Sequence, residues 1–151
     1  MTYDNLLDEC VNLGIKVKEL TLLGSDGRCK GNRIAISKKL STIKEKKCVL
    51  AEEMGHYHKT VGDILDQSNI NNIKQEIIAR RWSYEKLIGI VDIINAYRAG
   101  VKNRYELAEY LDVTEEFLNE AIEYYKCKHG IYYQIDNYLI YFEPLGVMEI
   151  F

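Results

Sequence analysis

The sequence predicts an α+β domain dominated by helices, with a small N-terminal sheet, a C-terminal helical pair and a terminal β-hairpin. Three observations lead to this prediction. Apolar residues recur at helical intervals along most of the chain, strand-like alternation occurs only before residue 40 and after residue 130, and clusters of Gly, Asn, Asp and Ser separate the segments. With 151 residues, 47% of them hydrophobic, the chain can bury one core but is short for two. We therefore expect a single domain over residues 1–151.

The N-terminal elements follow from local patterns. Residues 3–12 place apolar side chains at helical spacing, and Gly14 ends the run as a helix cap would. Residues 15–20 then alternate between apolar and polar, which is typical of a strand. A turn at 25–27 precedes a second strand around 33–37. A short packing helix and two strands are therefore expected first.

Two long helices are expected in the middle of the chain. The first should begin near Ser41 or Thr42, either of which is a fair N-cap, and run to about residue 57 or 59. A loop rich in Asp, Asn and Ser follows over residues 61–72. Asn71 or Asn72 can cap the second helix, which should break at Gly89 and restart through residues 91–97.

A new helical segment is expected from Asn103, which fits a helix start. Residues 106–124 indicate two helices joined by a tight turn at 112–114, the shape of a helix-turn-helix. A hairpin is expected over residues 131–142 around Asp136-Asn137, with Pro144 and Gly146 ending it. The outward positions of the second helix are acidic, which phosphates would repel, so this pair indicates protein packing or docking rather than DNA reading. They are Glu115, Glu116, Glu120 and Glu123.

Composition excludes several classes. The net charge of -3 and pI near 5.7 argue against a strongly electrostatic nucleic-acid binder, although local basic patches remain compatible with them. The cysteines show no Cys-x-x-Cys pair, which indicates reduced thiols rather than a zinc ribbon or a redox dithiol. No signal peptide or membrane span is indicated, so we expect a cytoplasmic protein without membrane partners. The four cysteines are Cys10, Cys29, Cys48 and Cys127.

One stretch carries the residue types of a metal site. Glu52 and His56 lie one helical turn apart, so both side chains can reach one ion. Glu53 follows directly, at the offset where a metalloprotease helix carries its general base, and Gly55 leaves room beside the imidazole. Glu76, on the next expected helix, would be a third ligand. Three protein ligands and one vacant position are what a catalytic zinc needs, but acidic pairs on helices are also commonly just solvated.

The pattern Glu52-Glu53-Met54-Gly55-His56, followed by Glu76-Ile-Ile-Ala79-Arg-Arg-Trp82, resembles the ImmA/IrrE family of phage- and mobile-element-encoded metallopeptidases. The resemblance covers most of the chain. It implies a zincin-like metallopeptidase domain, a helical segment after the catalytic core, and cleavage of a repressor protein. It also implies that His56 is a metal ligand, Glu53 the general base and Glu76 the third ligand.

The sequence departs from the family pattern at position 52, where the usual first His of the His-Glu-x-x-His motif is Glu52. A carboxylate can bind zinc, but two anionic ligands would weaken the ion as a Lewis acid and tilt selectivity toward Mn or Fe. Three interpretations stay open: an active site with Glu52 as ligand, a two-ligand site that binds metal weakly, and an inactive protease that acts as a binding protein. His58 lies about 200° around the helix from His56, so it is a surface residue, a second-shell group or an alternative ligand if the helix frays.

We therefore expect residues 1–100 to form the metal-site core and residues 101–151 a partner-docking part. The first functional hypothesis is a zinc-type endopeptidase that cleaves a phage or mobile-element repressor. The second is a metal-free pseudo-protease that binds the repressor as an anti-repressor. A DNA-binding regulator using residues 106–124 is the third, and direct DNA binding is not favoured. By analogy with thermolysin-like enzymes, the edge near 34–37 is expected to pair with an extended peptide, with an ordinary structural hairpin as the alternative.

Overall fold

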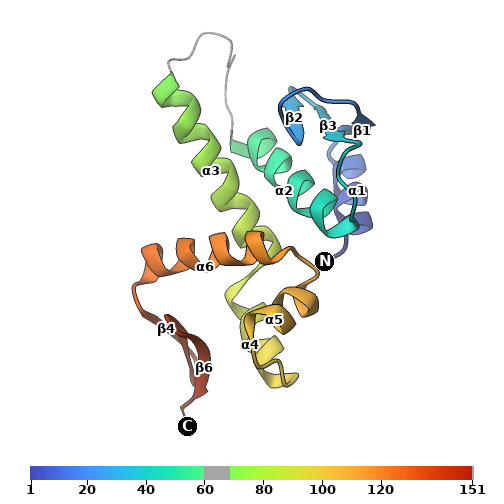
Figure 1. Cartoon of the computed structure of the whole chain (residues 1–151). Helices are drawn as coiled ribbons and strands as arrows, with labels where there is room; N and C mark the ends of the chain where they lie inside the picture. The colour runs from blue at the N-terminus through green and yellow to red at the C-terminus, as the bar shows by residue number, and fades with distance from the viewer. Residues whose placement is uncertain (60–68, 151) are drawn as a thin grey trace. The chain divides into compact units, whose positions relative to one another are not determined.

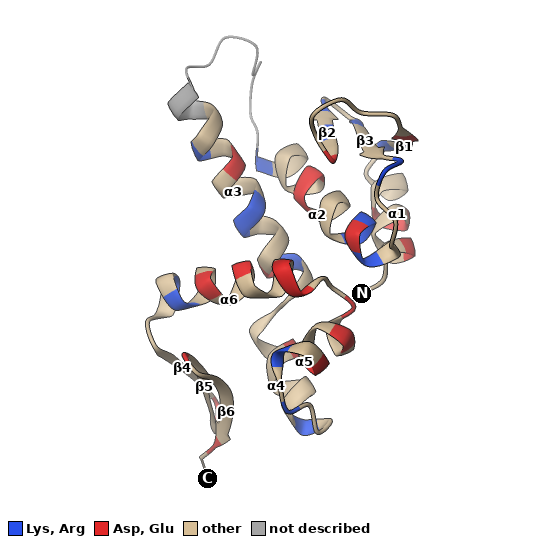
Figure 2. Cartoon of the chain, in the orientation of Figure 1, with Lys and Arg blue, Asp and Glu red and all other residues tan. Residues whose placement is uncertain are grey.

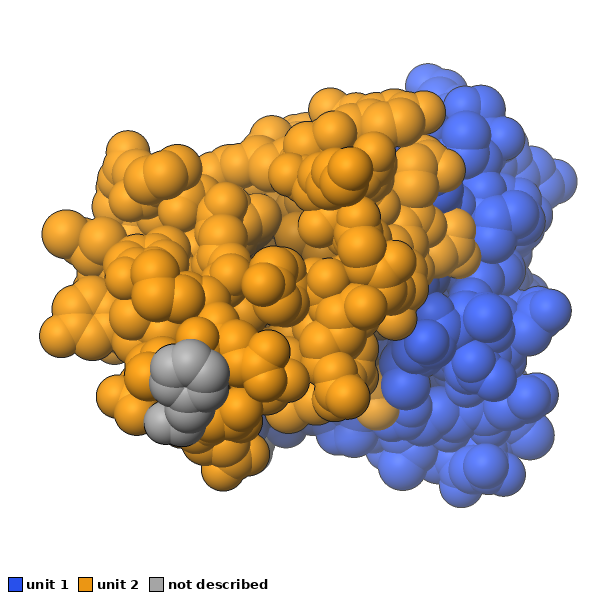
Figure 3. Space-filling view, turned by 90° about the horizontal axis from the view of Figure 1, so that it is seen from below, with its two compact units in different colours: residues 1–83 blue, residues 84–151 orange. Residues whose placement is uncertain are grey.

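The computed structural model describes residues 1–59 and 69–150 (Figure 1). It confirms the α+β, helix-dominated fold class. The chain divides into two compact units, residues 1–83 and 84–151, which Figure 3 distinguishes by colour. The single domain expected over residues 1–151 stays a prediction.

Unit 1 begins with helix α1 (Tyr3–Asn12), followed by strands β1 (Lys16–Leu20), β2 (Gly27–Lys30) and β3 (Arg33–Ser37). The sequence predicted α1, β1 and β3 but missed β2. The reason is that Gly27–Lys30 is only four residues long and has Cys29 as its one apolar side chain, so its alternating exposure gives a weak strand signal. It becomes a strand by pairing antiparallel with β3.

The strand order β1-β3-β2 places β3 in the middle of the sheet. β3 pairs parallel with β1 on one side and antiparallel with β2 on the other. The expectation that the segment 34–37 offers a free edge to a peptide is therefore wrong, because its backbone groups are already bonded on both sides. The edges of this sheet belong to β1 and β2.

Helix α2 (Ile43–Lys59) begins where predicted, because the Thr42 hydroxyl accepts a hydrogen bond from the backbone N–H of Glu45 at 3.1 Å. Helix α3 (Asn69–Leu87) starts earlier than expected. Asn71 and Asn72 therefore lie inside its first turn, and the cap predicted at these positions is wrong. Most of the loop predicted over residues 61–72 falls outside the described residues.

The core of unit 1 lies between α1, α2 and one face of the sheet. Side chains from all three are fully buried, so α2 is held firmly against the sheet. The apolar residues of these elements with 2% exposure or less are Leu6, Cys10, Ile34, Ile36, Leu50, Ala51 and Met54.

Unit 2 contains helices α4 (Ile90–Arg98), α5 (Arg104–Leu111) and α6 (Glu115–His129). The break at Gly89 is confirmed, and its N–H bonds to the Asp92 carboxylate at 2.8 Å. The α5–α6 pair is confirmed with Asn103 and Thr114 as N-caps, and the acidic positions predicted to face outward on α6 are exposed.

The C-terminal strands form an antiparallel sheet in the order β4 (Tyr132–Ile135), β5 (Tyr138–Phe142), β6 (Leu145–Glu149). The hairpin around Asp136-Asn137 is confirmed. The hairpin ends before Pro144, as expected, but Gly146 lies inside a third strand, β6, which pairs back along β5. None of the helices in the described part of the chain is long and apolar enough to cross a membrane.

Candidate metal centre

Two helices of unit 1 supply the candidate site. Helix α2 carries Glu52, Glu53 and His56, and helix α3 carries Glu76. The helices meet at Gly55, where an added Cβ would overlap the backbone carbonyl of Ala79. The close approach expected beside Gly55 is confirmed, and the absence of a side chain there lets α3 come near enough for Glu76 to reach α2.

The three expected ligands lie together. One ligand atom from each of Glu52, His56 and Glu76 lies within 4.8 Å of the other two, and His56 Nε2 is 3.2 Å from Glu76 Oε1. Two ligands about 2.1 Å from a tetrahedral ion are roughly 3.4 Å apart, so the group needs only a small contraction to surround one ion. The His56 side chain is 13% exposed and the Glu76 side chain 50%, so the group opens to solvent on the α3 side.

The donor set fits a divalent metal. Carboxylate and imidazole groups are common ligands of zinc, and three protein ligands with an open side match a catalytic rather than a closed structural site. The same two carboxylates also suit Mn²⁺ or Fe²⁺, because oxygen ligands favour harder ions. The residues present therefore fit a metal without selecting its identity.

The electrostatics of the group follow from its crowding. Burial lowers the pKa of His56, but the hydrogen bond with Glu76 and the surrounding carboxylates raise it above its ordinary value overall. The same hydrogen bond holds the pKa of Glu76 below its ordinary value. Burial raises the pKa of Glu52, an effect that the Arg80 guanidinium partly offsets. The group therefore brings two carboxylates, those of Glu52 and Glu76, close together, and a bound cation would stabilise them.

Arg80 completes this group, and the sequence analysis did not assign it a role. Its Nε lies 3.4 Å from Glu52 Oε1, from a position one turn after Glu76 on α3. The available signal was this spacing, since residues four apart on a helix share a face. The pair shows that Glu52 has a partner other than an ion.

Glu53 is not one of the three grouped ligands, and its carboxyl lies against strand β2. An added Cβ on Gly27 would come within 2.8 Å of both Cγ and Oε1 of Glu53, so the glycine leaves the space that this carboxyl occupies. Only 7% of Glu53 is exposed, and burial raises its pKa to about 7, with His56 opposing the shift. A carboxyl of this kind can both accept and release a proton near neutral pH. Sequence reasoning also missed this role of Gly27.

His58 lies outside the three-ligand group. It is exposed, and its ring stacks on Trp82 with 4.8 Å between centroids and an interplanar angle of 28°. The structure thus places His58 as the surface residue expected from the helical period, with Trp82 as a packing partner.

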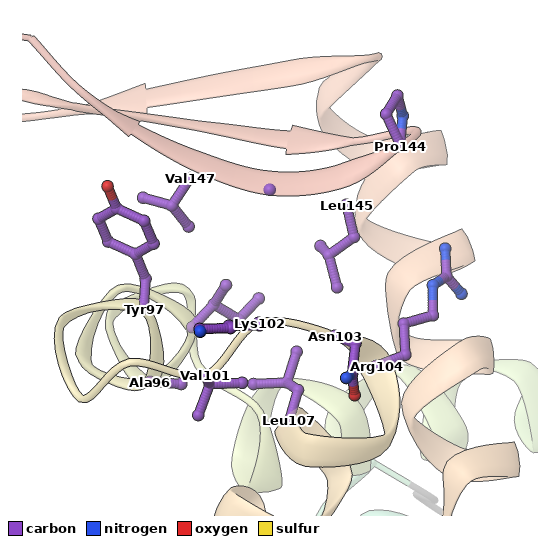
Figure 4. Close-up of a pocket in the computed structure, with 12 residues that line it drawn as sticks. Ala96, Tyr97, Val101, Lys102, Asn103, Arg104, Leu107, Pro144, Leu145 and Val147 are labelled. Atoms are coloured by element: carbon purple, nitrogen blue, oxygen red, sulfur yellow. The ribbon is translucent and has the colours of Figure 1, made fainter.

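Unit 2 holds a pocket of about 520 Å³ between α4, the start of α5 and β6 (Figure 4). Its walls are mainly apolar, with Tyr97, Lys102 and Arg104 among the residues around it. The lining contains no carboxylate, imidazole or thiol, and its titratable side chains are Tyr97, Lys102 and Arg104.

A protein-family comparison matches the chain over residues 10–123 to a peptidase family described as the IrrE N-terminal-like domain. The match spans more than half of the chain and includes α2 and α3, the two helices of the metal centre. No curated protein and no solved structure matches the chain significantly.

Proposed function

The chain belongs to the IrrE N-terminal-like (ImmA/IrrE) peptidase family, and from this premise we propose that it is a metal-dependent endopeptidase that cleaves a repressor protein. Cleavage would release a phage or mobile element from silence. The observation that carries the proposal is the convergence of Glu52, His56 and Glu76 from two helices. Glu53 is the neighbouring buried carboxyl on α2 and interacts electrostatically with His56.

In this proposal Glu52, His56 and Glu76 hold the ion, which is zinc or, given the two carboxylates, Mn²⁺ or Fe²⁺. When bound, the metal supplies Lewis-acid chemistry. Glu53 acts as the general base: it takes a proton from the attacking water and passes it to the amine that leaves as the peptide bond breaks. The Arg80 guanidinium pairs with the Glu52 carboxylate, so the ion competes with Arg80 for this ligand.

Strand β2 is the proposed platform for the substrate backbone. It is an edge strand, it packs against α2, and its Gly27 lies directly over Glu53. An extended peptide that adds to this edge by β-augmentation would pass next to the general base. Its edge position and its contact with Glu53 favour β2 as the strand that pairs with the substrate, in place of the segment 34–37 that the sequence suggested.

The test combines metal content with cleavage. Protein purified without chelator is analysed by inductively coupled plasma mass spectrometry, and we expect close to one ion per chain. A peptide library is then incubated with the protein, and new termini are identified by mass spectrometry. Glu53→Gln should keep the ion and the fold but lose the cleavages, whereas the exposed control Glu116→Gln on α6 should keep both. Equal cleavage by Glu53→Gln would remove this residue from the mechanism.

One observation favours a second candidate, a metal-free pseudo-protease that acts by binding the repressor. The Arg80 guanidinium already pairs with Glu52, so this carboxylate is partly neutralised without an ion. This candidate predicts less than a tenth of an ion per chain and no cleavage by the unmodified protein. The exposed acidic residues of α6 do not favour the third hypothesis, DNA reading by residues 106–124.

A further inference from the structure

The outer face of the N-terminal sheet is strongly cationic. Successive residues of a strand point to opposite faces, so alternate positions of β1, β2 and β3 share the face that points away from α1 and α2. Five of these positions are Lys or Arg, all exposed: Lys16, Lys18, Arg28, Lys30 and Arg33. We call this set the basic sheet face. Figure 2 shows Lys and Arg in blue on these strands.

The pairing register brings these cations into two adjacent rows. Lys16 and Lys30 both pair with Arg33, one from each neighbouring strand, so the three form a row across the sheet. Lys18 and Arg28 both pair with Ala35 and form the next row. Adjacent strands are about 4.8 Å apart, and residues two apart on a strand about 6.6 Å, so the Cα atoms of the five cations lie within roughly 12 Å of one another.

The basic sheet face is concave and lacks counter-charges. Its residues line a hollow of about 420 Å³ together with Leu20, Ile34 and Ala35. None of the five cations pairs with a carboxylate of residues 1–59 or 69–150. The one acidic residue of these three strands, Glu19, alternates to the other side and pairs with Lys46 of α2 at 3.0 Å.

The positive charge of the basic sheet face contrasts with the net negative charge of the whole chain. The protein carries a net charge of -3, yet one small sheet gathers five of its 20 Lys and Arg side chains without an acid on the same face. Like charges on neighbouring strands repel one another, at a cost of up to about 1 kcal/mol for each pair. An anion that bridges the two rows would remove this repulsion.

We propose that the basic sheet face binds the phosphate backbone of a nucleic acid. A nucleic-acid strand presents one anion per nucleotide without interruption, which matches two cation rows that no acid interrupts. An acidic protein segment would satisfy fewer positions, because its carboxylates alternate with other side chains. The face has no aromatic residue on which a base could stack, so binding is to the backbone and independent of sequence.

This site is separate from the metal centre and from the helix-turn-helix-like segment. Its side chains lie on the face of the sheet that points away from α2, but it shares strand β2 with the proposed substrate platform, and Arg28 also lowers the pKa of Glu53. Duplex binding requires neither metal nor cleavage, so it is tested separately from the peptidase proposal. A peptidase bound in this way would be held near protein substrates that occupy DNA.

The salt dependence of binding gives a quantitative expectation. If all five cations contact phosphates of duplex DNA, the slope of log K against log salt should be roughly −4 to −5. This corresponds to a loss of about 500-fold in affinity between 50 and 200 mM salt.

Fluorescence anisotropy with a labelled 20-base-pair duplex of random sequence tests the proposal. The sheet variant combines Lys16→Glu, Lys30→Glu and Arg33→Glu. The control variant combines Lys74→Glu, Arg98→Glu and Lys102→Glu, which are exposed positions outside the sheet and change the net charge equally. We expect the control to bind within about threefold of the unmodified protein and the sheet variant to lose at least tenfold, with a shallower slope of about −2.

Two further measurements keep the outcome decisive. If the Glu variant does not fold by circular dichroism, the neutral Gln variant at the same three positions takes its place. A poly-glutamate peptide is titrated in parallel as the acidic-protein alternative. The proposal is overturned if the unmodified protein does not bind the duplex at 50 mM salt, if both variants lose affinity equally, or if poly-glutamate binds more tightly than the duplex.

Discussion

Gly55 offers the most direct test of how the metal centre is assembled. Replacement by Ala adds one methyl group at the point where α2 meets the backbone of α3. The atom that it would overlap is the carbonyl oxygen of Ala79, a fully buried residue. A backbone atom cannot rotate away as a side chain could, so the two helices must separate.

The expected magnitude comes from two opposing effects. Overpacking a buried contact costs about 1–3 kcal/mol, and a backbone overlap belongs at the upper end of this range. Gly to Ala inside a helix returns about 1 kcal/mol. The net loss is then roughly 2 kcal/mol, which for a chain of this size lowers Tm by about 4–8 °C. Separation of Glu76 from His56 should also weaken zinc binding by about tenfold or more.

Thermal unfolding and calorimetric zinc titration measure the two effects. Gly146→Ala is the matched control, because an added Cβ there meets no atom within 4 Å and the backbone φ is not positive. A Gly55→Ala protein with unchanged Tm and unchanged zinc affinity would refute the claim that close helix approach builds the site.

Three further predictions concern single contacts. Arg80→Ala removes the cation beside Glu52. Because the guanidinium then no longer competes with zinc for this carboxylate, calorimetry should show tighter zinc binding. Tyr125→Phe leaves the carbonyl of Ile88 without its 2.6 Å buried hydrogen bond, and urea unfolding should show a loss of about 1–3 kcal/mol. The Glu85 carboxyl accepts hydrogen bonds from Lys128 and Tyr124, which hold its pKa below the ordinary 4.5. Its contribution to stability should thus be full above pH 4.5 and fade as pH falls through the lowered pKa, so urea unfolding of the unmodified protein and Glu85→Gln should converge in acid.

Each of these has a contrary result. Weaker zinc binding by Arg80→Ala would mean that the guanidinium supports the ligand rather than competing for it. An unchanged unfolding free energy for Tyr125→Phe would mean that the carbonyl finds another donor. Parallel pH curves for the unmodified protein and Glu85→Gln would remove that carboxylate from the acid sensitivity of unit 2.

The helical parts of the candidate site could be predicted because they depend on local periodicity. The spacing of Glu52 and His56 fixes a common face wherever the segment is helical. Helix boundaries are marked locally by the Thr42 hydroxyl, which accepts a hydrogen bond from the N–H of Glu45, and by the N–H of Gly89, which donates to the Asp92 carboxylate. Family resemblance, rather than spacing, singled out Glu76 among the carboxylates of α3.

Tertiary structure alone decided what surrounds these residues. Strand β2 is four residues long with one apolar side chain, Cys29, and depends on its pairing with β3. Its position at the edge, the placement of Gly27 over Glu53 and the clustering of the basic sheet face therefore could not be predicted from the sequence. The partner of Arg80 depended likewise on how α3 crosses α2. Local sequence determines which way a side chain faces on its own helix or strand, whereas the neighbour it meets depends on contacts between segments far apart in the chain.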